Sequence, residues 1–499
     1  MSGQSSIEAF GELQPRAVWK FFGGMAAVPR PSKREERIRK HLREVAEHHG
    51  LAVKEDSTGN LVIDVPATEG FADAPITVLQ AHVDMVCEKN AATEHDFDTE
   101  GIRLIVTTEE STGERIVRGD GTTLGADNGL GVALALAVAT SPDVVHGPLE
   151  LLFTVDEEDG MTGAKALTAE SFRGRRMLNL DSEEDDTLCI GCAGGCDTNL
   201  SWTLKAAAPA GDEVCKVSVT GLRGGHSGCD IHEGRANAIK LLVRTLLRVS
   251  GDSLQLISIS GGSKRNAIPR EATAVVAGPA GLLGALQTAG AAVAAEAVAE
   301  SVEPDTSIVA EKVAPGTATL AASASDTTTL LRALAALPSG VLGMHPKVPG
   351  LVETSNNVST MSSELRGSSV VVRVGMLSRS SSASRIAETA EQLASIGRLS
   401  GAEVATGNEY PGWSPNPESA LLAVCRRVYR ETFDADPEVG AIHAGLECGI
   451  IGKRVGDMDM VSLGPTIRGA HSPDERAYVS SVERTWRYLV ALLEAMARG

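Results

Sequence analysis

The chain of 499 residues is long enough for two or more domains, and its hydrophobic content of 42% is ordinary for a globular protein. Its formal net charge of −19 argues against a nucleic-acid partner and against an anionic membrane surface. The opening stretch, Met1 to Gln4, has no basic segment followed by an apolar core, so we expect no signal peptide. The apolar stretch from Ala280 to Ala299 is interrupted by Gln287 and Glu296 and predicts a helix of a soluble domain, not a membrane span.

Eight cysteines in a chain of this length do not suggest a disulfide framework. Cys189, Cys192 and Cys196 are closely spaced, but no second matched pair follows them. The sequence therefore favours reduced thiols over a thiolate metal site, which is consistent with a cytoplasmic protein.

The N-terminal region predicts two helices and a hairpin. The first helix runs from Pro15 to Val28, and the second from Lys33 to His49, with Ser32 as its predicted cap. Residues 51–65 alternate in the manner of a β-hairpin with a turn near Gly59.

Three later strands each end in side chains that can bind metal ions. A buried strand from Ile76 to Ala81 leads into His82 and Asp84, which an extended chain places on the same side. Asp84 can then orient His82 from behind the ligands. The strand 149–155 delivers Glu157 and Glu158, and the strand 176–180 ends in Asp181. Since ligands bind at strand ends in open α/β sheets, we expect these groups to gather there.

Two further candidates lie in glycine-rich segments. Asp127 follows a run of small residues and precedes a helix that we expect from Val132 to Thr140. Its carboxylate could bridge two cations, but on local grounds a helix-capping role is an equally good interpretation. His471, in the loop after Gly469, is the remaining candidate ligand.

Clustered carboxylates repel one another unless a cation lies between them. Two histidines and three carboxylates suit two divalent ions, with zinc as the first expectation and manganese or cobalt as alternatives. Such a pair activates water for hydrolysis, and a carboxylate that is not a ligand takes the water's proton. Either Glu157 or Glu158 fills that role, and the residue types alone leave the choice open.

The region from about Cys192 predicts a second α/β unit inserted into the first. It carries His226 as a possible donor to a carbonyl oxygen, and Arg379 and Asn266 as possible partners of a substrate carboxylate. The chain then returns with a helix from Pro417 to Phe433 and a terminal helix from Ser481 to Arg498. We therefore expect an α/β fold in which a catalytic domain, residues 1–190 and 409–499, has a mixed, mostly parallel sheet flanked by helices and surrounds a lid at residues 191–408.

Several motifs together resemble the aminoacylase/carboxypeptidase family of co-catalytic zinc peptidases, and within it the cytosol non-specific dipeptidase, or aminoacyl-histidine dipeptidase, branch. The resemblance covers essentially the whole chain. The segments that carry it are HVDMVCEKN (82–90), DGTTLGADNGLGVA (120–133), FTVDEEDGMTGA (153–164), NLDSEE (179–184), GLRGGHSG (221–228), DIHEGRANA (230–238) and GAHSPDE (469–475).

The resemblance implies a role for each candidate. One metal ion would be bound by His82, Asp127 and Asp181, and the other by Asp127, Glu158 and His471. Glu157 would be the general base and Asp84 the orienting acid. His226 would polarise the scissile carbonyl from the dimer partner, Arg379 would bind the substrate carboxylate, and Glu447 would meet the substrate amine. The Asp127–Asn128 peptide bond is expected to be cis.

The expected function is therefore that of a cytoplasmic metallo-dipeptidase that acts on Xaa-His and other dipeptides, including carnosine-like β-alanyl substrates. We expect a homodimer formed through the lid, two divalent metal ions per subunit and a dipeptide substrate. An N-acyl amino-acid hydrolase with the same binuclear site is the alternative enzyme, and a metal-binding scaffold without catalysis is the alternative outside enzymes.

Overall fold

The computed structural model describes residues 10–251, 253–313 and 320–499. Met1 to Gln4, on which the expectation about a signal peptide rests, lie outside these residues. The chain forms two compact units. The first contains Met1–Gly191, Pro415–Ala441 and Glu447–Gly499, and the second contains Cys192–Ser414 and Ile442–Leu446.

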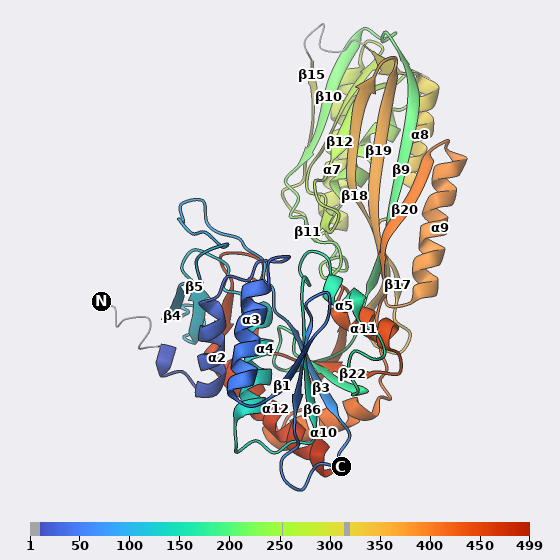
Figure 1. Cartoon of the computed structure of the whole chain (residues 1–499). Coiled ribbons are helices and arrows are strands. Elements are labelled where there is room, and N and C mark those ends of the chain that lie inside the picture. The colour runs from blue at the N-terminus through green and yellow to red at the C-terminus, as the bar shows by residue number, and fades with distance from the viewer. Residues whose placement is uncertain (1–9, 252, 314–319) are drawn as a thin grey trace. The chain divides into compact units, whose positions relative to one another are not determined.

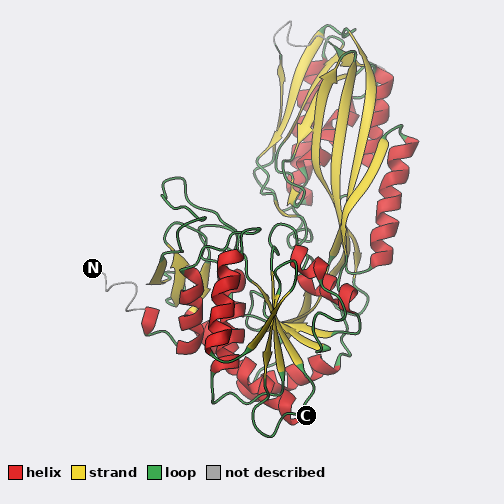
Figure 2. Cartoon of the chain, viewed as in Figure 1, coloured by secondary structure: helices red, strands yellow, loops and turns green. Residues whose placement is uncertain are grey.

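The first unit is built on an eight-stranded mixed sheet (Figures 1 and 2). The strand pairs β3–β6, β3–β7 and β7–β22 are parallel, whereas β1 and β2 join one side of this group as antiparallel strands. Every residue of β3 and of β6 is buried, so both faces of the sheet centre are covered. In sheet order, the strands are β1 (Ala52–Glu55), β2 (Leu61–Val65), β6 (Leu149–Thr154), β3 (Thr77–His82), β7 (Arg176–Asn179), β22 (Asp459–Ser462), β8 (Thr187–Cys192) and β21 (Glu438–Ile442).

Helices from both ends of the chain cover this sheet. Helix α4 packs on β3 and α2 packs on α4, while α10 packs on β22 and α12 packs on α10. Their apolar side chains and those of the strands form one buried core around residues such as Phe22, Leu79, Phe153 and Leu492. The helices of this unit are α2 (Arg16–Ala26), α3 (Glu36–His48), α4 (Ala126–Thr140), α5 (Thr162–Ala166), α10 (Ala420–Phe433), α11 (Glu447–Val455) and α12 (Val479–Arg498).

A small four-stranded sheet lies beside these elements in the first unit, in the order β23 (Ile467–Arg468), β24 (Arg476–Tyr478), β5 (Arg115–Gly119) and β4 (Leu104–Thr108). It brings the segment around His471 next to the segment before Asp127. One local prediction is wrong. Ser32 does not cap α3, whose N-cap residue is Glu35, and its hydroxyl instead donates a hydrogen bond to Asp84.

The second unit contains a ten-stranded sheet whose described pairs are all antiparallel (Figure 1). Helices α6 (Ala238–Val249), α7 (Leu282–Glu300), α8 (Ala324–Ala336) and α9 (Ala383–Leu399) pack on it and close a separate hydrophobic core. The strands are β15 (Ser307–Lys312), β10 (Glu213–Thr220), β14 (Ala272–Gly278), β12 (Gln255–Gly261), β18 (Val352–Arg366), β19 (Ser369–Ser380), β9 (Gly194–Ala207) and β16 (Ala321–Ala322), with β17 (Gly340–Met344) on β18 and β20 (Glu403–Tyr410) on β9. A mixed sheet with a parallel centre, together with an inserted sheet-and-helix unit, confirms the predicted fold class.

Helix α7 covers the apolar stretch discussed above. By length and composition alone it could cross a membrane. In the structure it packs on β15 and α6, and Leu286 and Val293 are fully buried in the core of the second unit. The small two-stranded sheet of β11 (Gly225–His226) and β13 (Ala267–Ile268) completes this unit.

Candidate metal centre

Three adjacent strands of the first unit bring the predicted ligands together. β6, β3 and β7 are neighbours and run parallel, so their carboxyl ends meet at one edge of the sheet. His82 is the last residue of β3, Glu157 and Glu158 follow β6, and Asp181 follows β7. The Nε2 atom of His82 lies 3.4 Å from Oδ1 of Asp181. The strand-end prediction therefore holds for the geometry of this edge.

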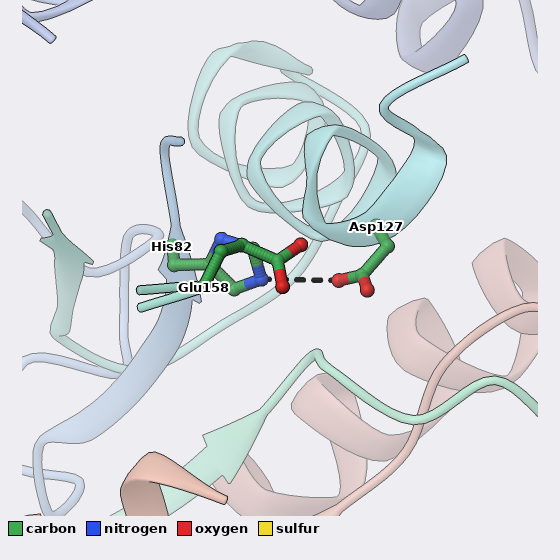
Figure 3. Close-up of side chains that lie close together, drawn as sticks. All are labelled: His82, Asp127 and Glu158. Atoms are coloured by element: carbon green, nitrogen blue, oxygen red, sulfur yellow. Dashed lines mark hydrogen bonds and ion pairs between the residues drawn. The ribbon is translucent and has the colours of Figure 1, made fainter. Parts of the chain in front are cut away.

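Asp127 enters from the start of α4. The Asp127–Asn128 peptide bond is cis, as the resemblance implied, and the helix begins with Gly125 at a positive φ of 69°. Asp127 and Asn128 have non-helical backbone angles at a kink within α4, and no side-chain cap hydrogen bond is found at its N-cap residue, Gly125. The Asp127 carboxylate faces two imidazoles. Its Oδ1 is 3.0 Å from Nε2 of His82 (Figure 3), and its Oδ2 is 3.1 Å from Nε2 of His471.

The second histidine completes a second group of donors. Nε2 of His471 also lies 3.0 Å from Oε2 of Glu158. The ligand atoms of His82, Asp127 and Glu158 lie within 4.8 Å of one another, which is the spacing of a candidate metal site (Figure 3). Two ligands at about 2.1 Å from one tetrahedral ion are themselves roughly 3.4 Å apart, so the observed separations fit cations held by these groups.

The electrostatics of this cluster also favour a cation. Burial raises the pKa of Asp181 to about 6, and the neighbouring carboxylates of Asp127 and Glu158 add to the rise. Burial raises the pKa of Glu157 well above its usual range, with Asp181 and Glu158 acting in the same direction. Hydrogen bonds to Asp127 and Glu158 raise the pKa of His471 to about 11. Without a cation, protons must therefore neutralise the cluster, and a bound metal ion would displace them.

Asp84 lies behind the ligands, fully buried. Its Oδ1 is 3.3 Å from Nδ1 of His82, and its carboxylate accepts hydrogen bonds from the backbone N–H groups of Glu157 (3.0 Å) and Glu158 (3.2 Å). Burial alone would raise the pKa of Asp84, but the His82 contact and the bond from Ser32 outweigh it and lower the pKa to about 2. Asp84 therefore stays ionised and fixes both the His82 ring and the turn that carries the two glutamates.

A buried polar network that the sequence did not predict lies under the same edge. Glu447 is fully buried, and its Oε2 accepts hydrogen bonds from Thr154 (2.5 Å) and from the Gln80 amide (2.7 Å). Burial raises the pKa of Glu447 to about 7. Gln80 and Thr154 were assigned no role from the sequence because both lie inside apolar strands, although Thr154 belongs to the 153–164 segment of the resemblance. Their positions, two residues before His82 and three before Glu157, point to the site.

The remaining predicted residues lie in the second unit. Arg379, with 4% of its surface exposed, donates to the Tyr410 hydroxyl (2.8 Å), and its Nη2 is 3.3 Å from Nε2 of His226. The carbonyl oxygen of Asn266 accepts a hydrogen bond from the backbone of Ser227, next to His226. The structure thus brings Arg379 and His226 together and places the Asn266 loop next to His226. Tyr410 was not predicted from the sequence, because it contacts Arg379 from a separate strand, β20.

Comparison with known proteins shows the family. A profile of the peptidase family M20/M25/M40 matches residues 78–495. The chain belongs to this family. It is 40% identical over 490 residues to the cytosol non-specific dipeptidase of Escherichia coli (strain K12), which covers 98% of this chain and 99% of that protein.

Two solved structures are also similar to this chain. The crystal structure of an aminoacylhistidine dipeptidase from Vibrio alginolyticus has a TM-score of 0.86 at 40% identity, covering 97% of this chain and 98% of that chain. A tripeptidase from Staphylococcus aureus subsp. aureus Mu50, at 16% identity and a TM-score of 0.62, covers 98% of this chain and 100% of that chain and has the same fold.

Proposed function

We propose that this chain is a metal-dependent dipeptidase of the cytosol that hydrolyses Xaa-His and other dipeptides. The family membership and the full-length similarity to the dipeptidase of Escherichia coli support the reaction, and the similarity to the aminoacylhistidine dipeptidase supports the Xaa-His preference. The observation that carries the proposal is the position of Asp127, because each of its two carboxylate oxygens faces a different imidazole.

Two divalent cations fit this arrangement, one between His82, Asp127 and Asp181 and the other between Asp127, Glu158 and His471. Oε1 of Glu158 is buried and has no hydrogen-bond partner among the described residues. Among the same residues, Oδ1 of Asp181 has no hydrogen bond or ion pair other than its 3.4 Å approach to His82, and both observations support the assignment. Zinc suits this set of imidazoles and carboxylates, and manganese and cobalt are the alternatives. When bound, the ions lower the pKa of water and polarise a carbonyl oxygen.

Glu157 is the general base in this proposal. Its backbone is held by Asp84, and its carboxylate makes no hydrogen bond or ion pair with another described residue, unlike that of Glu158. It therefore remains available to take the proton of the attacking water and to deliver it to the leaving amine. Asp84 keeps the His82 ring in the orientation that presents Nε2 to the site.

The two ends of a dipeptide need opposite charges. Glu447 offers a buried carboxylate for the free amine, and Arg379, with the Asn266 segment beside it, offers a guanidinium for the free carboxylate. Nε of Arg379 is buried without a hydrogen-bond partner among the described residues, which supports an anionic ligand there. His226, in contact with Arg379, is the proposed donor to the scissile carbonyl.

The second unit is the proposed lid, residues 191–408 in our division of the chain, and it forms a homodimer. If His226 acts across the dimer, mixing inactive His226→Ala and Glu157→Ala subunits will restore part of the activity. No recovery after verified subunit exchange would argue against that role.

The function is tested by a hydrolysis panel. We expect cleavage of Xaa-His dipeptides and carnosine, loss of cleavage with a chelator, and recovery with one of zinc, manganese or cobalt. N-acetylated dipeptides should be poor substrates, because acylation removes the charge that Glu447 would bind. Preference for N-acyl amino acids would instead favour an aminoacylase, and no hydrolysis with any metal ion would favour a scaffold.

A further inference from the structure

Glu475, four residues after His471, holds the turn that precedes Asp127. Its buried carboxylate accepts four backbone hydrogen bonds. Oε2 accepts from the N–H groups of Leu124 (2.7 Å) and Gly125 (2.9 Å), and Oε1 accepts from those of Ala126 (2.7 Å) and Asp127 (3.3 Å). These donors belong to the turn that precedes the kink at Asp127 and Asn128, whose backbone angles are not helical, so they need acceptors from outside the helix.

Arg30 holds the same turn from the other side. Its buried guanidinium donates from Nη1 to the carbonyl oxygen atoms of Val83 (3.0 Å) and Asp84 (2.9 Å), directly after His82, and from Nη2 to that of Gly125. No side-chain carboxylate of a described residue forms an ion pair with Arg30. The N–H groups of this buried cation are directed at three backbone carbonyl groups, while burial lowers its pKa and the nearby carboxylates of Glu475 and Asp84 act in the opposite direction.

The two charges meet on one peptide group. The carbonyl of Gly125 and the N–H of Ala126 belong to the same peptide unit, so Arg30 and Glu475 hold it from its two ends. Gly125 has a φ of 69°, and a Cβ atom there would clash with Nη2 of Arg30. Glycine is therefore required both by the backbone conformation and by the close approach of the guanidinium.

We propose that Arg30 and Glu475 are positioning residues that fix Asp127 between His82 and His471 before any metal ion binds, and so set the metal affinity of the site. Arg30 joins the His82 segment to the Gly125 turn, and Glu475 joins the His471 segment to it. Neither side chain is one of the proposed ligands. The inference rests on the proposed function, because Asp127 must be the shared ligand for its position to matter. Residues that orient ligands from behind typically change metal affinity by about 10–100-fold when they are replaced.

Glu475→Gln is the first test, since it keeps the shape of the side chain but turns an amide towards backbone N–H groups that need an acceptor. Zinc alone is titrated into the metal-free protein in competition with a chromophoric chelator, and thermal unfolding of the metal-free form is measured in parallel. We expect zinc affinity to fall at least about tenfold. Arg30→Lys is a second variant. A lysine cannot donate to all three carbonyl groups that Arg30 binds, so zinc affinity should fall in this variant as well.

Glu150→Gln is the matched control. Glu150 is also a buried glutamate of the first unit, and it accepts backbone hydrogen bonds from Arg173 (2.9 Å) and Gly174 (2.8 Å), but on β6 away from the ligand-bearing strand ends. It should lose thermal stability and keep the wild-type zinc affinity. Unchanged zinc affinity in Glu475→Gln and Arg30→Lys, or equal weakening in Glu150→Gln, would overturn the inference. A wild-type chain that binds none of zinc, manganese and cobalt would instead refute the proposed metal centre.

Discussion

Glu157 and Glu158, the two adjacent glutamates after β6, provide the sharpest test of the site. The proposal makes Glu157 the general base and Glu158 a metal ligand. Glu158 has its Oε2 3.0 Å from Nε2 of His471, as expected for two ligands of one ion. Glu157 has no such contact with a described histidine. Replacing each by glutamine removes one charge and leaves the size of the side chain unchanged, and the turn itself stays anchored because Asp84 binds the backbone N–H groups of both residues.

Glu157→Gln should therefore bind both metal ions and lose catalysis. The contribution of a positioned general base is typically 100- to 10,000-fold in rate, or about 2.7 to 5.4 kcal/mol of transition-state stabilisation. Glu158→Gln should lose activity for another reason, since one of the two cations loses its carboxylate ligand. Its metal content after dialysis should fall from two ions to one, while Glu157→Gln keeps two.

The assay combines kcat for a dipeptide at saturating zinc with metal analysis of the dialysed variants. If Glu157→Gln loses a metal ion and Glu158→Gln retains both, the two roles are exchanged. If Glu157→Gln keeps a rate near that of the wild type, Glu157 is not the general base. The distinction between Glu157 and Glu158 that rests on the His471 contact is then refuted as well.

Three other changes test separate parts of the molecule. Arg379→Lys cannot keep the planar fork that binds a carboxylate, so KM for dipeptides should rise about tenfold or more while dipeptide amides, which lack that charge, respond little. Burial lowers the pKa of His443 to about 3, whereas the pKa of an unfolded histidine is about 6.5. This histidine therefore contributes its full stability above about pH 6.5, and the contribution is lost as the pH falls from there towards 3. Going from about pH 8 to about pH 5 should remove about 2 kcal/mol of unfolding free energy in urea titrations, and His443→Gln should abolish that part of the slope. Gly131→Ala places a Cβ atom 2.6 Å from the carbonyl oxygen of Leu180 and should lower the melting temperature, whereas Gly284→Ala, in a helix with open space around it, should not.

The sequence predicted the parts of the site that follow from local pattern. A buried apolar strand that ends in His82 or in Asp181 can be recognised from a few residues, and parallel strands meet at one edge of a sheet. The resemblance then supplied the pairing of ligands. The choice between ligand and base at Glu157 and Glu158 did not follow from residue types, because both are glutamates on one turn.

What the sequence did not reveal depends on contacts between distant segments. Ser32 has the local pattern of a helix cap, yet its hydroxyl binds Asp84. Gln80 and Thr154 are polar residues within apolar strands, and their role becomes visible only in the structure, where both donate hydrogen bonds to Glu447. Glu475 lies in the GAHSPDE segment that carries the resemblance, but neither it nor Arg30 was assigned a role. What each binds is backbone, and the identity of a backbone partner cannot be deduced from side-chain types.

The contacts between distant segments also determine how precisely the metal centre is held. The proposed ligands come from separate segments that span residues 82 to 471, and a carboxylate shared by two ions must hold both of its oxygens in place at once. Asp127 lies at a kink near the start of α4, and by itself the turn before it would leave its backbone N–H groups without partners. Because Glu475 satisfies those donors and Arg30 binds the carbonyl of the same turn, the Asp127 side chain is held by interactions from both ends of the chain. The precision of the centre therefore depends on two residues outside the ligand set, and this is the reason that metal affinity, not folding alone, should respond when either is changed.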